Sequence, residues 1–338
     1  MDRFPACRQA DALTSGPDNV EMILAVRSQL ICNKHLSPSR RPEPLHGPIS
    51  QPEGVEGFFI RMKKEKSTVG QSSRTPYKHW LYRFMLGKMV GAAATGKTPC
   101  GDTIRVLDMC AGDGAETGPD PYSSSPAIAD RHMTSTFPGS NRLRRIAYLY
   151  ERETTTHARL ISRYGGKPHI QIFHHDSKGI TLADIGGKPS DGIFVYADPN
   201  SVSTLPVTPE LIRSFTPTTL FLMTLGCNVG GIKRLPIEDR KGWLDVVDLM
   251  VRARNRYHDI MIMSLNRDDS QWAYLAAFPM KWAEDFQADS VKAGSRHWPN
   301  GVSAYSITRQ PVAFRDKIQE LFYTAKEREQ MNQPELTV

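Results

Sequence analysis

The stretch Val106-Leu107-Asp108-Met109-Cys110-Ala111-Gly112-Asp113-Gly114 is a short apolar run that ends in small residues and two aspartates. Apolar residues followed at once by glycines predict a buried strand that enters a tight turn, the place where an open α/β sheet holds a nucleotide-like ligand. Glycine lets the backbone approach a ligand closely, and a carboxylate accepts hydrogen bonds from ligand amino or hydroxyl groups. The stretch predicts a cofactor site, and a plain strand-to-helix connection is the alternative.

On both sides of this stretch, apolar runs of strand length alternate with segments of helical spacing. Such alternation predicts an α/β fold with a doubly wound, mostly parallel sheet. We expect seven strands, at 105–109, 146–150, 170–174, 193–197, 219–224, 259–265 and 272–279. Helices are expected at 81–90, 154–164, 210–214 and 242–257, where apolar residues recur with a period of three to four.

Composition places the chain among globular proteins, because 39% hydrophobic and 23% charged residues over 338 positions can form one large core or two modest ones. Five prolines between Ser37 and Gly54 predict a linker. We therefore expect an extended, partly disordered N-terminal arm at 1–56, an α/β domain at 57–325 and a polar tail at 326–338. No apolar run is long enough to span a bilayer, and Asp2 and Arg3 do not fit a signal peptide, so a cytoplasmic location without membrane contact is expected.

Cysteine and histidine patterns predict no metal site. The five cysteines are scattered without a CxxC spacing, which is typical of reduced thiols. His174, His175 and Asp176 are adjacent at an expected strand end, where neighbouring side chains point to opposite faces and cannot readily share one ion. A thiolate nucleophile at Cys110 or Cys227 has no histidine tied to it by a motif.

An acidic residue stands at or just after the end of each of the first four expected strands: Asp108, Glu151, Asp176 and Asp198. In a doubly wound sheet these strand ends open onto one edge, so four carboxylates would line one crevice. A carboxylate can accept hydrogen bonds from two adjacent hydroxyls, as on a ribose. The alternative is that each acid caps a helix N-terminus.

In this order of motifs the chain resembles the class I S-adenosylmethionine-dependent methyltransferases, from about Tyr77 to Arg309. The resemblance implies a Rossmann-like methyltransferase fold. It also implies that Glu151 holds the ribose hydroxyls of S-adenosylmethionine and that Asp176 faces its adenine amino group. The methionine half of the cofactor would lie against Asp108, Ala111, Gly112 and Gly114.

The segment Asp198-Pro199-Asn200 resembles part of the (Asp/Asn/Ser)-Pro-Pro-(Tyr/Phe) tetrad of amino-group methyltransferases, the DNA adenine type among them. The resemblance implies that Asp198, Pro199 and Asn200 form the catalytic site, with the Asp198 side chain and the Pro199 carbonyl accepting hydrogen bonds from the target amine. Asn200 and Ser201 replace the second proline and the aromatic residue. The ring that would stack on a flipped base is thus missing, and a methyltransferase-like binding module without catalysis is a second hypothesis.

A third resemblance, to the three-Cys-motif partner proteins, lies in the order of three segments: Lys78-His79, the turn from Asp108 to Gly114, and Ser125-Pro126-Ala127-Ile128-Ala129. Between Asp176 and Ile193 the chain has no long insertion for target recognition. Sequence specificity would come from 115–145, from 226–258, from the N-terminal arm or from a protein partner.

A competing motif is Gly91-Ala92-Ala93-Ala94-Thr95-Gly96-Lys97-Thr98, which matches the phosphate-binding pattern GxxxxGK[ST]. It would make the protein a nucleoside triphosphatase built around Lys97. A phosphate-binding loop needs a strand before it and a helix after it, whereas here an expected helix comes first and Pro99 and Gly101 follow. A flexible helix-to-strand loop is the interpretation that fits this context.

Basic residues form four clusters in a chain of formal net charge +7: Arg61 to Lys66, Arg142 to Arg145, Lys233 to Lys241 and Arg252 to Arg256. Most charge clusters are solvated faces. If several meet at the cofactor edge, they would form a track for a phosphate backbone, with Trp298 available for stacking on a base. The sequence thus predicts a methyltransferase that acts on nucleic acid, with the amino group of a base as the favoured acceptor.

Overall fold

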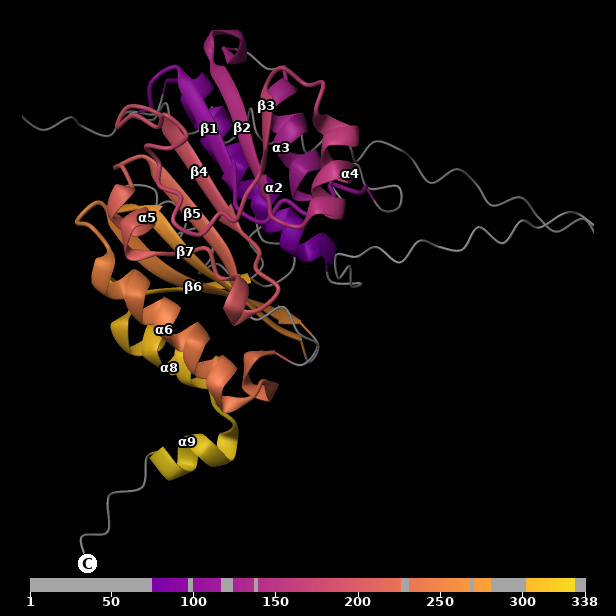
Figure 1. The fold of residues 1–338 in the computed structure, drawn as a ribbon. Helices are drawn as coiled ribbons and strands as arrows, with labels where there is room; N and C mark the ends of the chain where they lie inside the picture. Colours follow the sequence, from indigo (N-terminus) through magenta and orange to yellow (C-terminus); the bar gives the residue numbers. More distant parts are fainter. Residues whose placement is uncertain are drawn as a thin grey trace, which may run out of the picture. The chain divides into compact units, whose positions relative to one another are not determined.

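Apolar strands of five to ten residues form one sheet in the computed structural model (Figure 1). The model describes residues 75–96, 100–116, 124–136, 139–225, 231–267, 270–280 and 302–331. In this part of the chain the strands are β1 (Thr103–Asp108), β2 (Arg144–Glu151), β3 (Ile170–His174), β4 (Gly192–Ala197), β5 (Thr219–Leu225), β6 (His258–Arg267), β7 (Ser270–Pro279) and β8 (Val302–Ser306). Their order across the sheet is β3-β2-β1-β4-β5-β7-β6-β8.

Strands β1 to β5 are parallel, whereas β7 is antiparallel to both β5 and β6, and β8 is antiparallel to β6. The strand order reverses between β1 and β4. On one side of β1 the sheet continues with β2 and β3, and on the other side it continues with β4 and β5. At such a switch point the loops leave on opposite faces and open a crevice outside the carboxyl ends of the strands. The turn after β1 lies at that point.

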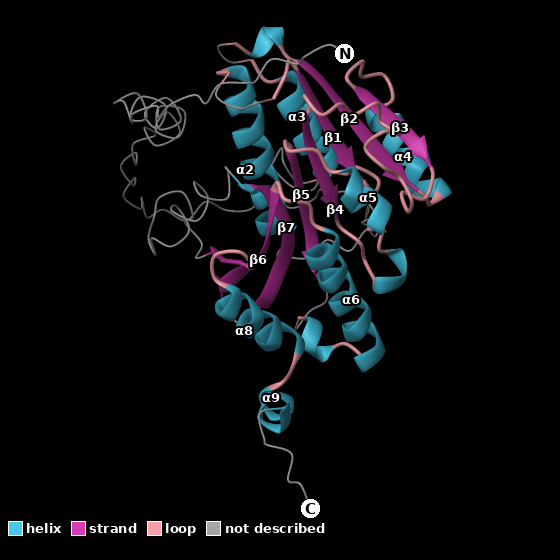
Figure 2. Ribbon diagram, turned by 90° about the vertical axis from the view of Figure 1, so that its left-hand side faces the viewer, coloured by secondary structure: helices cyan, strands magenta, loops and turns pink. Residues whose placement is uncertain are grey.

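Helices cover both faces of the sheet (Figure 2). One face packs against α2 (Thr75–Ala94), α3 (Ser125–Thr134) and α4 (Thr154–Tyr164), and the other against α5 (Pro209–Ser214), α6 (Ile237–Ala253) and α8 (Pro311–Phe322). The central strands β4 and β5 are buried along their whole length, which explains why their sequences are almost continuously apolar rather than alternating. The doubly wound, mostly parallel α/β fold expected from the sequence is confirmed.

One expectation about the sheet was wrong, because an eighth strand exists beyond the seven expected. β8 has only five residues, with a mixed sequence, Val-Ser-Ala-Tyr-Ser. It forms through its neighbours, since its backbone pairs with β6 and the Ser306 hydroxyl donates to the buried carboxylate of Asp259 at 2.5 Å. Tertiary pairing of this kind leaves little trace in local sequence.

The helices largely follow the predicted ranges. α4 has the expected bounds, whereas α6 begins at Ile237 rather than at Gly242. The residues expected to begin the polar tail lie in a short helix, α9 (Ala325–Met331), which Glu327 fixes through a bidentate ion pair with Arg240 of α6, at 2.9 and 3.0 Å. The expected N-terminal arm at 1–56 lies outside the described residues. None of the described helices is long and apolar enough to cross a membrane.

Candidate functional site

The turn after β1 is held between the ends of the two strands that flank β1. The Met109 amide donates to the carbonyl of Tyr196 on β4 at 2.9 Å, and the Ala111 amide donates to the carbonyl of Tyr150 on β2 at 3.1 Å. Gly112 follows with φ +63°, a left-handed conformation that a side chain would strain. The predicted glycine turn therefore lies at the switch point of the sheet, with its backbone fixed by both neighbours.

Glu151, the last residue of β2, lies against this turn. Its Oε2 accepts a hydrogen bond from the Gly112 amide at 3.0 Å, and its Oε1 accepts one from the Glu153 amide at 2.8 Å. A carboxylate offers about four lone-pair sites, so these two bonds orient the group without using its full capacity. The structure thus brings together the glycine turn and the acid that we expected to hold the ribose.

Asp108 lies at the end of β1 and is fully buried. Its Oδ1 accepts a hydrogen bond from the Cys110 amide at 3.2 Å, which begins the turn. On the α2 side of the sheet, burial and the nearby negative charge of Asp108 together raise the pKa of Tyr82 well above its usual range. This placement makes Asp108 a support beneath the turn.

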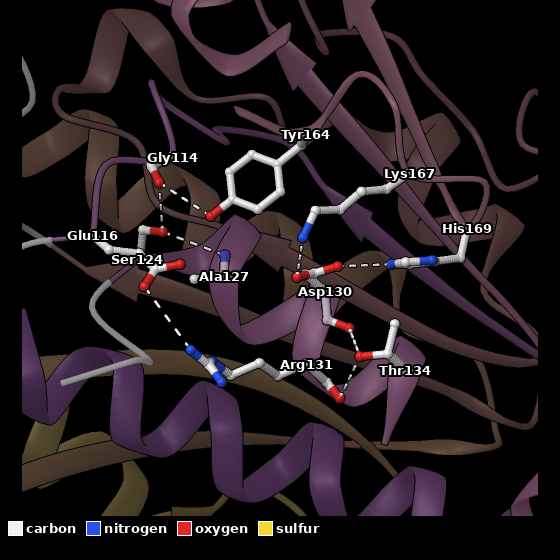
Figure 3. Close-up of polar contacts among 10 residues, drawn as sticks. All are labelled: Gly114, Glu116, Ser124, Ala127, Asp130, Arg131, Thr134, Tyr164, Lys167 and His169. Atoms are coloured by element: carbon white, nitrogen blue, oxygen red, sulfur yellow. Dashed lines mark hydrogen bonds and ion pairs between the residues drawn. The ribbon is translucent and has the colours of Figure 1, made fainter. Parts of the chain in front are cut away.

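The second glycine of the turn, Gly114, is enclosed by side chains of α4 and of the segment before α3 (Figure 3). Its carbonyl accepts hydrogen bonds from the Ser124 and Tyr164 hydroxyls, both at 3.2 Å. Its φ is +66°, and a Cβ at this position would lie 2.5 Å from Cε2 of Tyr164. Burial, which is the main influence on this phenol, raises the pKa of Tyr164 to about 12, so it remains a hydrogen-bond donor at neutral pH. Glycine is required here by both conformation and space.

Asp113, between the two glycines, is tied to the last turn of α4. Arg163 donates to the Asp113 carbonyl and pairs with its carboxylate at 3.2 Å. Further along, Asp130 of α3 accepts hydrogen bonds from Lys167 at 2.5 Å and His169 at 2.7 Å, residues that connect α4 to β3 (Figure 3). These contacts fix α3 and α4 around the turn.

The loop after β3 also reaches the turn. The buried Ser177 hydroxyl donates to the Met109 carbonyl at 2.7 Å. The preceding residue, Asp176, is exposed, and its carboxylate accepts a hydrogen bond from the Lys178 amide at 3.0 Å. Asp176 therefore lies at the same edge as Glu151 but is open to solvent. The assignment of this residue to the adenine remains a prediction.

Two histidines that the sequence analysis did not combine stack beside Glu151. The rings of His157 and His174 lie 4.6 Å apart with an interplanar angle of 18°. The α-carbon of His174 is the β3 partner of Glu151. Burial and the neighbouring His174 both lower the pKa of His157. Within the described residues no group of His, Cys, Asp and Glu is arranged to hold a metal ion.

The candidate acceptor loop follows β4. Asp198 is partly exposed, and its Oδ1 accepts a hydrogen bond from the Thr224 hydroxyl of β5 at 2.5 Å. Pro199 is buried and Asn200 is exposed, while Ser201 caps the short helix η2 (Val202–Thr204). Thr224 was not predicted from the sequence, because a threonine within an apolar strand carries no motif.

Tyr196, two residues before Asp198, does not replace the aromatic ring missing from the tetrad. Its side chain is fully buried and its ring lies 4.4 Å from the ring of Tyr82 on α2, nearly parallel to it. The ring therefore belongs to the core between α2 and the sheet. An aromatic side chain that stacks on the acceptor would have to come from another residue.

The competing phosphate-binding motif begins inside a helix. Gly91 to Ala94 form the last turn of α2, and the amides of Thr95 and Gly96 donate to the carbonyls of Gly91 and Ala93, both at 3.1 Å. Lys97 and Thr98 lie outside the described residues. The motif thus starts at the end of a helix and β1 follows it, which is the reverse of the order that a phosphate-binding loop requires.

The basic clusters do not converge on one edge. Arg142 and Arg145, at the amino end of β2, donate to backbone carbonyls of Ala94 and Ser135. Arg252 to Arg256 precede β6, also at the amino edge of the sheet. Of the three clusters within the described residues, Lys233 to Lys241 alone follows the carboxyl end of β5, beside the acceptor loop. The cluster from Arg61 to Lys66 lies outside the described residues, as does Trp298.

No family model and no curated protein matches the chain. Among solved structures, it is similar to an rRNA methylase from Streptococcus thermophilus, with 9% identity, a TM-score of 0.36 and coverage of 59% of this chain and 94% of the methylase. It is also similar to magnesium protoporphyrin IX methyltransferase from Synechocystis with bound S-adenosylmethionine, with 9% identity, a TM-score of 0.32 and coverage of 62% and 85%.

A further similar structure is fibrillarin from Aeropyrum pernix in complex with S-adenosylmethionine, with 15% identity, a TM-score of 0.31 and coverage of 55% of this chain and 73% of fibrillarin. These likenesses are distant, so the fold assignment rests on the strand order and register of the chain itself. The sheet is mostly parallel and ends in antiparallel strands. This topology gives the chain a doubly wound α/β fold.

Proposed function

We propose that this protein is an S-adenosylmethionine-dependent methyltransferase that acts on nucleic acid. The observation that carries the proposal is the 3.0 Å hydrogen bond from the Gly112 amide to Glu151, which joins the glycine turn to the acid of the next strand at the switch point. An α/β sheet binds nucleotide-like ligands at this point. A glycine turn beside an oriented carboxylate matches a ligand with a ribose and a charged amino-acid end.

The chemistry of the donor set fits the cofactor. Glu151 would hold the ribose hydroxyls, because an oriented carboxylate accepts two hydrogen bonds from adjacent donors. Asp176 would accept from the adenine amino group. Ala111, Gly112 and Gly114 would border the methionine half, with Asp108 fixing the turn from below. When bound, S-adenosylmethionine supplies an electrophilic methyl group on a sulfonium.

The acceptor would be oriented by the loop after β4. The Asp198 carboxylate and the Pro199 carbonyl accept hydrogen bonds from the target amine and direct its lone pair along the line of transfer. Alignment of this kind is the main contribution that a protein makes to a displacement reaction. Exposed Asn200 would border the amine and its surroundings.

An acceptor on nucleic acid is favoured by two exposed basic side chains near this loop, which stand on either side of exposed Glu238 and Asp239. Exposed Arg234 and Lys241 flank the N-terminal end of α6, and α6 packs against η2 directly after the acceptor loop. Basic groups at this position would neutralise a phosphate backbone that passes the site. An amino group on a base is the acceptor that Asp198 and Pro199 would orient.

The test is transfer of labelled methyl groups from S-adenosylmethionine to separate pools of RNA, DNA and protein. We expect label in a nucleic-acid pool, a large loss in Asp198→Ala and a smaller, salt-dependent loss when Arg234 and Lys241 are changed to Gln. Label in the protein pool alone would contradict the proposed acceptor. Cofactor binding without methyl transfer to any pool would contradict the proposed enzymatic activity. It would favour the alternative of a methyltransferase-like binding module without catalysis.

A further inference from the structure

We infer that Thr224 is a positioning residue for the methyl-transfer reaction, acting through Asp198. This inference rests on the proposed function, because it concerns the carboxylate that would orient the acceptor amine. The observation behind it is one contact between two neighbouring strands. The Thr224 hydroxyl on β5 donates to Asp198 Oδ1, directly after β4, at 2.5 Å.

The contact joins a side chain within the sheet to one that lies just beyond it. Thr224 lies within β5 and its side chain is fully buried, with its backbone paired to Tyr274 of β7. Asp198 lies one residue beyond β4, where the sheet no longer fixes the chain. A hydroxyl anchored in the sheet therefore fixes the carboxylate at the start of the acceptor loop.

Burial of the hydroxyl has an energetic consequence. A hydroxyl removed from water costs free energy unless it is hydrogen-bonded, and valine has almost the same shape without that cost. Threonine and valine are both suited to strands, so the strand alone does not require the hydroxyl. A bond to a carboxylate gives the hydroxyl a charged acceptor, and such bonds are stronger than those between neutral groups.

Thr219, at the opposite end of β5, provides a matched control. It is also fully buried, and its hydroxyl accepts a hydrogen bond from the Thr216 amide at 2.9 Å. Five residues of strand, about 16 Å, separate it from Thr224. Thr219→Val therefore removes a buried threonine hydroxyl from the same strand without touching the acceptor loop.

The experiment compares Thr224→Val, Thr224→Ala, Thr224→Ser and Thr219→Val in the full chain. For each variant we would measure methyl transfer to the nucleic-acid pool labelled by the wild type, S-adenosylhomocysteine affinity and thermal unfolding. We expect Thr224→Val and Thr224→Ala to lower kcat by about 10- to 100-fold, because misplacing a reacting group by about 1 Å has effects of that size. Cofactor affinity stays unchanged, and Thr224→Ser and Thr219→Val keep kcat near the wild-type value. Thr224→Ala extends the test if the valine variant does not fold.

A double-mutant cycle separates positioning from a general structural role. In an Asp198→Asn background, Thr224→Val should lower kcat much less than it does in the wild type, because the two residues act as one unit. Three results would each overturn the inference and leave the proposed function intact. They are a wild-type kcat in Thr224→Val, equal losses of kcat in Thr224→Ser and Thr224→Val, and additive losses of kcat in the double-mutant cycle. Absence of transfer by the wild-type chain would overturn the proposed function first.

Discussion

Gly114 is the residue whose identity the structure constrains most directly. Its left-handed φ and its distance from Tyr164 both exclude a side chain, and its carbonyl accepts two hydrogen bonds. From the sequence we expected Gly114 to border the methionine half of the cofactor. The structure gives it a second role, in which it lets the chain pass between α3 and α4 without disturbing the turn at Gly112.

Gly114→Ala should therefore destabilise the protein by about 1–3 kcal/mol, since both backbone strain and a clash with Tyr164 oppose the methyl group. Urea denaturation monitored by circular dichroism would measure the change. Gly166→Ala is the matched control, because its Cβ would meet no atom within 4 Å and its φ is not left-handed. Wild-type stability in Gly114→Ala would contradict the close packing of Gly114 against Tyr164.

At the scale of elements, local sequence patterns predicted those parts whose burial follows from periodicity. The amphipathic spacing of α4 and the apolar run of β3 gave their bounds correctly. β8 was missed because its stability comes from pairing with β6 rather than from its own residues. Thr224 and the His157–His174 stack were missed for a related reason, since each depends on a contact between elements that only the register reveals.

The end of α2 allows a test of the competing motif. Gly91 is helical and a Cβ there would meet no atom within 4 Å, so Gly91→Ala should stabilise the protein by about 0.5–1 kcal/mol by removing an unfavourable helical glycine. Thermal unfolding would measure the gain, with methyl transfer expected to stay at the wild-type level. Loss of stability, together with loss of a nucleotide-dependent activity, would favour a phosphate-binding loop instead.

For the whole molecule, stability should depend on pH through His132 on α3. Burial, together with the positive charges of Arg83 and Arg145, lowers the pKa of His132 from 6.5 to about 4. The unfolded chain therefore binds more protons between these two values. The contribution of His132 to stability is full above about pH 6.5 and is lost as the pH falls towards 4.

Between pH 7 and pH 5 this histidine should account for a loss of about 1–2 kcal/mol in the free energy of unfolding. Denaturation curves at the two pH values would measure the loss in the wild type and in His132→Gln, which should be less sensitive to acid by that amount. His175→Gln, at an exposed position, serves as the control. Equal acid sensitivity in all three proteins would contradict the lowered pKa of His132.

The parallel strands place Asp108, Glu151, Asp176 and Asp198 at one edge of the sheet, as expected from the sequence. The identity of the methyl acceptor depends on other features, which the sequence did not predict. The strand ends meet because β1 to β5 are parallel, so any correct assignment of the strands leads to the same edge. The basic clusters followed no such rule, and two of them lie at the opposite edge. Topology therefore predicts the position of the acidic residues better than that of the basic clusters.

Calorimetric titration of the full chain with S-adenosylhomocysteine and, separately, with ATP tests the central claim that this edge binds S-adenosylmethionine. We expect S-adenosylhomocysteine to bind and Glu151→Gln to weaken it by about 10-fold or more, because a charged acceptor to the ribose is lost. Glu153→Gln, two residues further on, removes an exposed carboxylate that caps the N-terminus of α4, and this variant should bind S-adenosylhomocysteine like the wild type. Tight binding of ATP that is lost in Lys97→Ala, with no binding of S-adenosylhomocysteine, would contradict the claim.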